Sequence, residues 1–455
     1  MRASRLSLLA LFVLTPVLAG CIADEPAETA TVLPVPWERS FEQRTTPGDV
    51  GASEVAIAGN PLDPEHLVSA ANSGGGYAVH VTRDGGTAWT ASRFEAAWVD
   101  PLPNGAGRFR GLSDPVVAFG PDGALYLAGL AYIPTSAVFV AKSLDGGATW
   151  SEVVVTHESD LGTSFNDKEW LGANPTSGTL VLTWQKEPAM DQLRGVEAAL
   201  GNPADIDIGD IVVSRSTDGG TSWTEPQVVS RGRHNNGTQV AFTPDGRAHL
   251  LWLNYETGTL DHIVSTDDGV TWSDPKAVAD VEIVPPFARY GRMHTLPGFT
   301  ADPGSDALYA VWHDRRNGDA DVYAIASPDG GETWREPVRV NQDDVGNGAV
   351  QFYPWAAVDP DGRLHVTFYD SRHDDHPRFH FYHAYAEGPE LDFIETGNVT
   401  SQDFTVFVAP DGSTGEQRGI GDYTGIAATT SGVFPAWADG RDEKVGVWSV
   451  RLALP

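Results

Sequence analysis

Short apolar runs separated by tight polar turns recur along the chain from about residue 50 onward. The clearest copies span residues 117–126, 240–249 and 357–365, each an apolar run, a Pro-Asp-Gly turn and a second run. Runs of this length joined by Asp-Gly are typical of β-hairpins. Four looser copies begin near Glu54, Trp170, Gly298 and Tyr423. The pattern predicts an all-β chain built from seven similar units.

An octapeptide of the form S-x-D-x-G-x-T-W recurs five times, with small variations, at residues 82–89, 143–150, 216–223, 265–272 and 327–334. Its aspartate can accept hydrogen bonds from its own turn, and its glycine permits positive φ. Its tryptophan can pack between sheets, so we expect buried indoles at Trp150, Trp223, Trp272 and Trp334. We expect the aspartates to be structural: Asp84, Asp145, Asp218, Asp267 and Asp329.

The spacing of these aspartates is 61, 73, 49 and 62 residues. This is the period of a four-stranded propeller blade with loops of variable length. The sequence therefore predicts a β-propeller of four-stranded blades, with seven blades and six as the alternative. The last unit supplies about three strands, so a strand near residues 31–38 could complete its sheet and close the ring.

The octapeptide resembles the Asp box, or BNR repeat, of sialidase-like (neuraminidase-type) propellers. This resemblance covers residues 82–334 and is specific for the fold. It is less specific for chemistry, because Asp boxes also occur in propellers that hydrolyse other glycans or only bind. Familiar sialidases have six blades, so seven units are a departure from the family.

The N-terminus is expected to direct export and anchoring. Arg2 and Arg5 precede an apolar run at residues 8–14 that is too short to span a bilayer. The next segment, Leu-Ala-Gly-Cys, resembles the lipobox of prokaryotic lipoproteins and ends at Cys21, the only cysteine. A plain signal peptide with a chance cysteine is the alternative. We expect a signal peptide at residues 1–20, a lipid anchor and tether at 21–33, and one propeller at 34–455.

Charge and composition exclude other classes. The chain carries 62 acidic and 30 basic residues, for a formal net charge of −32. Such a surface repels nucleic acid and anionic lipid, so we expect no nucleic-acid partner and membrane contact through the lipid anchor only. A salty habitat and an ordinary acidic secreted protein both explain this charge. The expected location is the outer face of the cell membrane, with the protein a monomer.

Alternation of strand direction within a blade assigns polar segments to one face. The segments that lead into the first strands supply Asp114, Lys168, Glu169, Asp422 and Tyr423, among others. The segments that follow the second strands share an aromatic-x-Asp-x-Arg pattern at residues 312–316, 368–372 and 437–441. These Asp–Arg pairs could bridge blades structurally. They could instead present guanidinium groups at the mouth to clamp a carboxylate.

By resemblance, sialidases hold the sugar carboxylate with three arginines, use a tyrosine paired with a glutamate as nucleophile, and use an aspartate as acid/base. The residues that could carry these roles here are Tyr423, Asp422 and Asp114 for catalysis. The arginines that could bind substrate are Arg372, Arg292, Arg315, Arg316, Arg441 and Arg418. The family's Phe/Tyr-Arg-Ile-Pro segment is absent, and no Tyr–Glu pair can be assigned.

Two functions follow from these observations. The first is a surface lipoprotein with a glycoside hydrolase of the exo-α-sialidase type, acting on a glycan or other anionic sugar. The second is a non-catalytic propeller that binds a glycan or protein partner. No cofactor or dedicated metal site is expected. The acidic segments at residues 205–210, 319–321 and 343–344 could bind calcium through their loop carboxylates. The alternative is that they form a solvated acidic surface.

Overall fold

The computed structural model describes residues 39–40, 42–47, 51–94, 109–151, 153–188, 209–232, 235–284, 293–373, 378–408, 418–442 and 444–453. They belong to one compact unit, Pro36–Pro455, and Met1–Val35 lies outside the described residues. Within these ranges the chain is nearly all β-strand, with one short 3-10 helix, η2, at Gly388–Glu390. No helix in this part of the chain is long and apolar enough to cross a membrane.

Seven four-stranded antiparallel sheets make up the fold, as the sequence predicts. The first three sheets are β2(Ser53–Asn60), β3(Asp63–Ser73), β4(Gly76–Thr82), β5(Thr90–Phe94); β6(Gly111–Phe119), β7(Leu125–Tyr132), β8(Thr135–Ser143), β9(Val154–Asp160); and β10(Ser164–Ala173), β11(Leu180–Pro188), β12(Asp210–Ser216), β13(Gln227–Ser230). The next three are β14(Asn235–Phe242), β15(Ala248–Asn254), β16(Thr259–Ser265), β17(Lys276–Asp280); β18(Gly298–Ala301), β19(Leu308–Asp314), β20(Asp321–Ser327), β21(Val338–Arg339); and β22(Gln351–Val358), β23(Arg363–Asp370), β24(Arg378–Glu387), β25(Phe393–Asn398).

The seventh sheet joins the two ends of the described chain. Its strands are β29(Gly425–Thr429), β30(Gly432–Asp439), β31(Gly446–Ser449) and β1(Gln43–Arg44), with β1 pairing to β31. An N-terminal strand at residues 43–44 therefore completes the seventh sheet, and the predicted segment at residues 31–38 lies outside the described residues. Three short strands follow β25 in the chain: β26(Phe404–Thr405) pairs with β24 at the edge of the sixth sheet, and β27(Phe407–Val408) pairs with β28(Arg418–Gly419).

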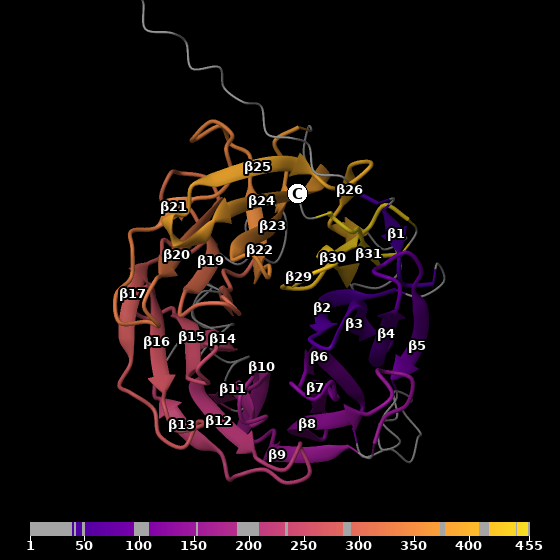
Figure 1. Ribbon diagram of the computed structural model, residues 1–455, viewed down its shortest axis with the longest axis vertical. Helices are drawn as coiled ribbons and strands as arrows, with labels where there is room; N and C mark the ends of the chain where they lie inside the picture. The colour runs from indigo at the N-terminus through magenta and orange to yellow at the C-terminus, as the bar shows by residue number, and fades with distance from the viewer. Residues whose placement is uncertain are drawn as a thin grey trace, which may run out of the picture. The chain divides into compact units, whose positions relative to one another are not determined.

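The sheets form a closed ring of blades around a central axis (Figure 1). In each blade the first strand lies at the centre and the fourth at the rim. Neighbouring first strands contact one another, and β29 of the last blade contacts β2 of the first. This is a seven-bladed β-propeller, the fold class and blade number that the repeat predicts.

The core consists of apolar clusters between successive blades. The largest fully buried side chains are tryptophans of second strands: Trp184, Trp252, Trp312 and Trp437. Each indole N–H has a polar partner; Trp184 donates to Asn166 Oδ1 at 3.0 Å, and Trp312 donates to Asp314 Oδ2 at 3.0 Å. Each of these tryptophans buries a large apolar surface without leaving its donor unsatisfied.

The octapeptide tryptophans are half-buried, which corrects the expectation that they are buried. The indole of Trp150 packs edge-on against Phe94 of the preceding blade at 5.6 Å between ring centres. Trp223, Trp272 and Trp334 likewise pack against the clusters that join their blade to the one before. They cover the outer edge of each cluster because the turn that carries them lies at the rim, whereas the second-strand tryptophans fill the interior.

The octapeptide turns have the hydrogen bonds that the sequence predicts. In the fifth copy, Asp329 Oδ1 accepts the backbone N–H of Thr333 at 2.8 Å, and Oδ2 accepts its hydroxyl at 2.5 Å. The Ser327 hydroxyl donates to the same carboxylate and accepts the N–H of Gly331 at 2.8 Å. Gly331 has φ of +86°, which a glycine adopts without strain. These carboxylates therefore act within their own turns.

Candidate active site

An extra residue interrupts the first strand of several blades at the same place. The pairing of β6, β10, β14 and β22 with their second strands shifts register between Ser113/Val116, Asp167/Trp170, Asn236/Gln239 and Phe352/Trp355. Each of these bulges contains a left-handed residue, as does a similar irregularity in β2: Glu54, Asp114, Lys168, Gly237 and Tyr353. A bulge re-aims the side chain it carries, and a left-handed non-glycine residue costs of order 1 kcal/mol. Such repeated strain marks the inner strand starts as a place to look for function.

Charged side chains from four consecutive blades meet at these bulges. The ammonium of Lys168 lies 3.0 Å from Asp114 Oδ2, 2.9 Å from Asp422 Oδ2 and 3.8 Å from Glu54 Oε1. Their strands β10, β6 and β2, and the segment leading into β29, lie side by side around the axis (Figure 1). All four side chains are at most 9% exposed. We call Glu54, Asp114, Lys168 and Asp422 the central cluster.

Neutral groups hold the carboxylates of the central cluster in position. Asn72 donates from its side-chain amide to Glu54 and to Ser113 Oγ, and it accepts the backbone N–H of Asp114 at 2.9 Å. The Ser113 hydroxyl donates to Asp114 Oδ1 at 2.5 Å, and the Asp422 N–H donates to Glu54 Oε1 at 3.2 Å. Charge-assisted bonds of this kind fix side-chain geometry more firmly than neutral ones.

The charges of the cluster stabilise one another. Burial alone would lower the pKa of Lys168, but the carboxylates of Asp114, Asp422 and Glu54 raise it well above its usual value. Burial alone would raise the pKa of Asp114, but Lys168 and the Ser113 hydroxyl hold it below its usual value. Asp114 is therefore ionised and Lys168 is cationic at neutral pH.

Glu169, the next residue along β10, has the opposite electrostatic environment. Its side chain is 2% exposed, and neither carboxyl oxygen has a hydrogen-bond partner among the described residues. Burial, and then the negative charge of Asp114, raises the pKa of Glu169 well above its usual range. The environment of Glu169 therefore favours its protonated form, while that of its electrostatic neighbour Asp114 favours the ionised form.

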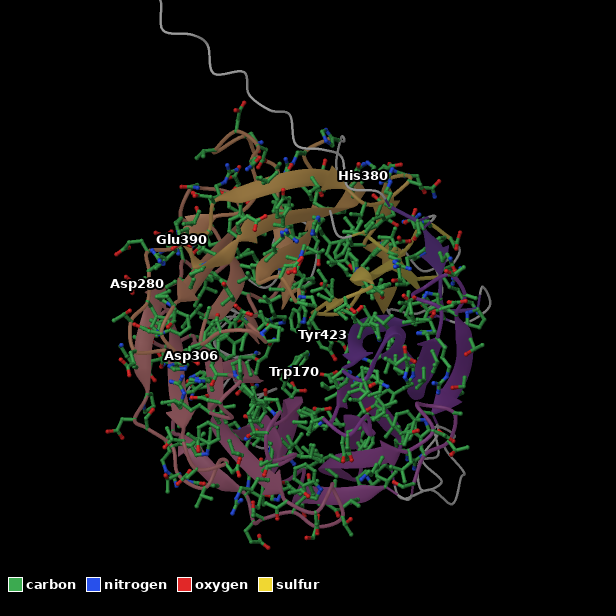
Figure 2. The ribbon with its side chains drawn as sticks, viewed as in Figure 1. Trp170, Asp280, Asp306, His380, Glu390 and Tyr423 are labelled. Carbon is green, nitrogen blue, oxygen red and sulfur yellow. The ribbon has the colours of Figure 1, made fainter. Side chains whose placement is uncertain are left out.

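Aromatic rings line the axis beside these carboxyls. Trp170, Trp355 and Tyr423 contact one another, with ring centres 5.3 Å apart for the two tryptophans and 5.8 Å for Trp355 and Tyr423. Figure 2 shows the Trp170 and Tyr423 side chains at the centre of the ring. Burial, and then Asp114, raises the pKa of Tyr423 well above its usual value, so its hydroxyl is protonated. That hydroxyl has no hydrogen-bond partner within the described ranges.

An aspartate with a lowered pKa and a neighbouring glutamate with a raised pKa can perform acid–base chemistry. When neighbouring carboxyls have pKa values that their environments push apart, one can donate a proton while the other acts as a base or nucleophile. The aromatic rings offer apolar faces to a ligand, and the unpartnered carboxyl and hydroxyl offer it hydrogen bonds.

The structure brings together the three residues predicted for catalysis. Asp114 and Asp422 share the ammonium of Lys168, and that ammonium lies 5.6 Å from the centre of the Tyr423 ring. Their catalytic roles stay predictions. The high pKa of Tyr423 differs from what an activated tyrosine nucleophile requires, because only the ionised hydroxyl attacks readily.

Three of the predicted substrate-binding arginines point away from the axis. Arg372 follows β23, yet its guanidinium binds Glu395 of the rim strand β25 at 2.7 Å and stacks on Tyr382 of β24 at 4.5 Å. It also binds Asp370, two residues earlier, with Nε 2.8 Å from Oδ2. Together these carboxylates raise the pKa of Arg372, although burial acts against them.

Arg316 and Arg441 repeat this arrangement. Arg316 binds Asp314, donates to the backbone oxygen of Asp280 at 2.8 Å and stacks on Tyr323 at 4.2 Å. Arg441 binds Asp439, lies 2.5 Å from Glu42 Oε1 and stacks on Trp448 at 4.1 Å. The Asp–Arg pattern therefore forms structural ion pairs, mostly within a blade. The guanidinium groups of Arg372, Arg316 and Arg441, which the sequence predicts as a clamp, already have carboxylate partners.

The remaining predicted site residues either lie outside the central cluster or are not among the described residues. Arg315 is exposed, and its backbone N–H donates to the oxygen of Glu282. Arg292, the side chain of Arg418, and Cys21 lie outside the described residues. Residues 205–208 of the first calcium candidate lie outside as well. Asp321 and Asp343 bind Arg339, and the described ranges contain no group of acidic or histidine side chains arranged to hold a metal ion.

Sequence reasoning placed Lys168 and Glu169 on the correct face but did not select them, and it overlooked Glu54. The sequence does contain a pattern that identifies these residues. Asp114, Lys168 and Glu54 each precede the regular part of a first strand, where other blades have Gly237 or Tyr353. Aligning the units at that position shows charged residues in three successive blades.

The chain has similar solved structures but no match among family models or curated sequences. No protein-family model matches the chain, and no curated protein matches its sequence. Similar solved structures include a protein of unknown function from Dyadobacter fermentans, 16% identical, covering 75% of this chain and 94% of that one, with a TM-score of 0.47. They also include the Hadza microbial sialidase Hz136 (14% identical, 85% and 73% covered, TM-score 0.45). The intramolecular trans-sialidase from Ruminococcus gnavus is 11% identical, with 77% and 96% covered and a TM-score of 0.48.

Proposed function

We propose that the protein is a glycoside hydrolase with its active site at the propeller axis. The observation that carries the proposal is the pair of neighbouring buried carboxyls, with the pKa of Glu169 raised and that of Asp114 lowered, beside the aromatic rings of Trp170, Trp355 and Tyr423. Glycoside hydrolysis needs one carboxylic acid and one carboxylate in one site.

In the proposed reaction, Glu169 donates its proton to the oxygen that leaves with the aglycone. The Asp114 carboxylate assists the attack on the anomeric carbon, either directly or by deprotonating water. Water finally supplies the hydroxyl of the released sugar and the proton that restores Glu169. Lys168 keeps Asp114 ionised and positioned, as does the hydroxyl of Ser113.

Tyr423 has a different role in this proposal from the one that the family resemblance implies. Its raised pKa makes it a poor nucleophile and a good hydrogen-bond donor. We assign it to binding the sugar, next to Trp170 and Trp355. Asp422 shares Lys168 with Asp114 and acts as a positioning residue.

The test uses the purified full chain and a panel of aryl glycosides with good and poor leaving groups. Glu169→Gln should reduce kcat by about 100-fold or more on poor leaving groups and much less on a dinitrophenyl glycoside, which needs no proton. Asp114→Asn should reduce turnover of both. Glu256→Gln, at an exposed site, is the matched control and should behave as wild type. Equal losses on both leaving groups would contradict the assignment of the acid.

A non-catalytic propeller is the second candidate, and one observation favours it. The central cluster is almost completely buried and ties together the starts of four blades, as a purely structural element also would. Binding of a glycan without turnover of any glycoside would establish this alternative.

We further propose that Cys21 anchors the protein in the outer face of the membrane. The lipobox-like segment supports this proposal. Cys21→Ser should move the protein from the membrane fraction to the soluble fraction, and unchanged membrane association would refute the anchor.

A further inference from the structure

Three of the arginines predicted to hold a ligand carboxylate are already engaged with protein groups. Arg316, Arg372 and Arg441 bind protein carboxylates and stack on aromatic rings of third strands, farther from the axis than their own strands. Lys168 lies at the axis, but its ammonium already binds Asp114 and Asp422 at 3.0 and 2.9 Å. A ligand carboxylate would have to displace one of these partners.

The unsatisfied groups at the axis suit a different kind of ligand. Glu169 and Tyr423 are 2% and 6% exposed, and their carboxyl and hydroxyl groups have no hydrogen-bond partners among the described residues. A buried polar group without a partner costs of order 1–3 kcal/mol, so such groups in a native fold call for an explanation. Ligand hydroxyl groups both donate and accept hydrogen bonds, and so could satisfy a protonated carboxyl and a phenol together.

The charge and the aromatic rings around these groups also favour an uncharged ligand. The ionised carboxylate of Asp114 lies beside Glu169, and a second negative charge placed there would be repelled without the shielding of bulk water. The rings of Trp170, Trp355 and Tyr423 provide apolar faces against which the C–H face of an uncharged sugar can pack.

We propose that the site takes a neutral sugar, and that sialic acids and uronic acids are excluded from it. This inference rests on the proposed function, because it names the substrate class of the same site. It departs from the anionic substrate that the sequence resemblance implies. Specificity would arise from the Asp114 carboxylate, which opposes an anion, and from the engagement of Arg316, Arg372 and Arg441 with protein carboxylates.

Two measurements on the full chain in detergent separate this inference from the proposed function. The first compares kcat/KM on 4-methylumbelliferyl glycosides of neutral pentoses and hexoses with the sialoside and the glucuronide. Neutral substrates should be preferred by at least about 100-fold. Comparable or faster turnover of the sialoside or glucuronide would overturn the neutral-sugar inference while leaving the enzyme in place.

The second measurement is a binding titration that needs no catalysis. Neutral methyl glycosides and oligosaccharides should change the intrinsic tryptophan fluorescence, and free sialic acid or glucuronic acid should not. Trp170→Phe should reduce the signal, and Trp223→Phe, at the rim, should preserve it as the matched control. Neutral-sugar binding without turnover keeps the ligand class and overturns the hydrolase. Preferential binding of the acidic sugars, or no binding of any sugar, overturns the inference.

Discussion

The segments after the second strands and the segments before the first strands both lie toward one face of the propeller, yet they use charge differently. After the second strands, an aspartate and an arginine recur in three blades, and each arginine turns outward to further partners. Before the first strands, the corresponding residues differ from blade to blade, and the charged ones turn inward to a single ammonium. In this molecule, the charges that repeat stabilise blades, and the charges that break the repeat meet at the axis.

The difference follows from the geometry of a ring. A contact made inside one blade can be copied into the next blade, so the same residues serve each time. The axis occurs once, and side chains from different blades converge there with complementary chemistry. Irregular residues at a regular position are therefore a better guide to a propeller site than conspicuous repeated ones.

The strongest test of the comparison removes the shared cation of the central cluster. Lys168→Met should lower the free energy of unfolding by about 4 kcal/mol, because it leaves buried carboxylates without their counter-charge. Urea denaturation measures this change. Lys276→Met, at an exposed position, is the control and should stay within about 0.5 kcal/mol of wild type.

A second substitution separates destabilisation by lost charge balance from destabilisation by lost packing. Adding Asp422→Asn to Lys168→Met removes one of the stranded charges and should recover part of the lost stability. If the double variant is as unstable as the sum of the two single variants, the cluster is not an electrostatic unit.

The matching test for the repeated pairs is Arg372→Ala. Asp370 and Glu395 would lose a partner that is 11% exposed, and we expect a loss of about 3 kcal/mol of unfolding free energy. If the arginine is structural, KM for a substrate measured on the folded fraction should not change. A rise in KM would instead support the clamp. Arg315→Ala, at an exposed neighbouring arginine, should change neither quantity measurably.

The sequence predicts the local and repeated features of this structure better than the contacts between segments that no repeat connects. The blades, their number and the octapeptide turns are local and repetitive, so a pattern of glycine, aspartate and tryptophan is sufficient. Strand alternation also places Asp114, Asp422 and Tyr423 on one face. The outward direction of Arg372 and Arg441 depends on Glu395 of the rim strand β25 and on Glu42, which precedes the rim strand β1, and periodicity does not report such partners.

Acid should weaken the blades before it disturbs the axis. Burial lowers the pKa of His80 and His249 to about 3 and that of His262 to about 4, and these rings hydrogen-bond between second and third strands. Below pH 6.5 these histidines are protonated in the unfolded chain but stay neutral in the folded protein. Their full contribution to the free energy of unfolding is therefore present above pH 6.5 and is lost as the pH decreases. At pH 5, each of these histidines should lower the free energy of unfolding by about 2 kcal/mol relative to neutral pH.

Urea denaturation between pH 7.5 and 5.0 measures this dependence. His80→Gln should reduce the slope of unfolding free energy against pH, and His373→Gln, at an exposed histidine, should leave it unchanged. A slope that survives in His80→Gln would assign the pH dependence to other groups.

The smallest expected effect concerns the octapeptide turns. Burial raises the pKa of Asp329, but hydrogen bonds from the side chain and backbone of Thr333 hold it below its usual value, so the ionised carboxylate is the form that orders the turn. Asp329→Ala should cost about 1 kcal/mol of unfolding free energy, as the loss of a capping carboxylate does elsewhere. Kinetic parameters should not change, since the turn lies in the third-to-fourth-strand connection and makes its bonds locally.

Asp329→Asn should lower the free energy of unfolding less than Asp329→Ala does, because its amide oxygen can still accept the N–H of Thr333. A loss of turnover in Asp329→Ala, with stability intact, would show that a repeated residue takes part in function and would break the distinction between repeated and irregular charges.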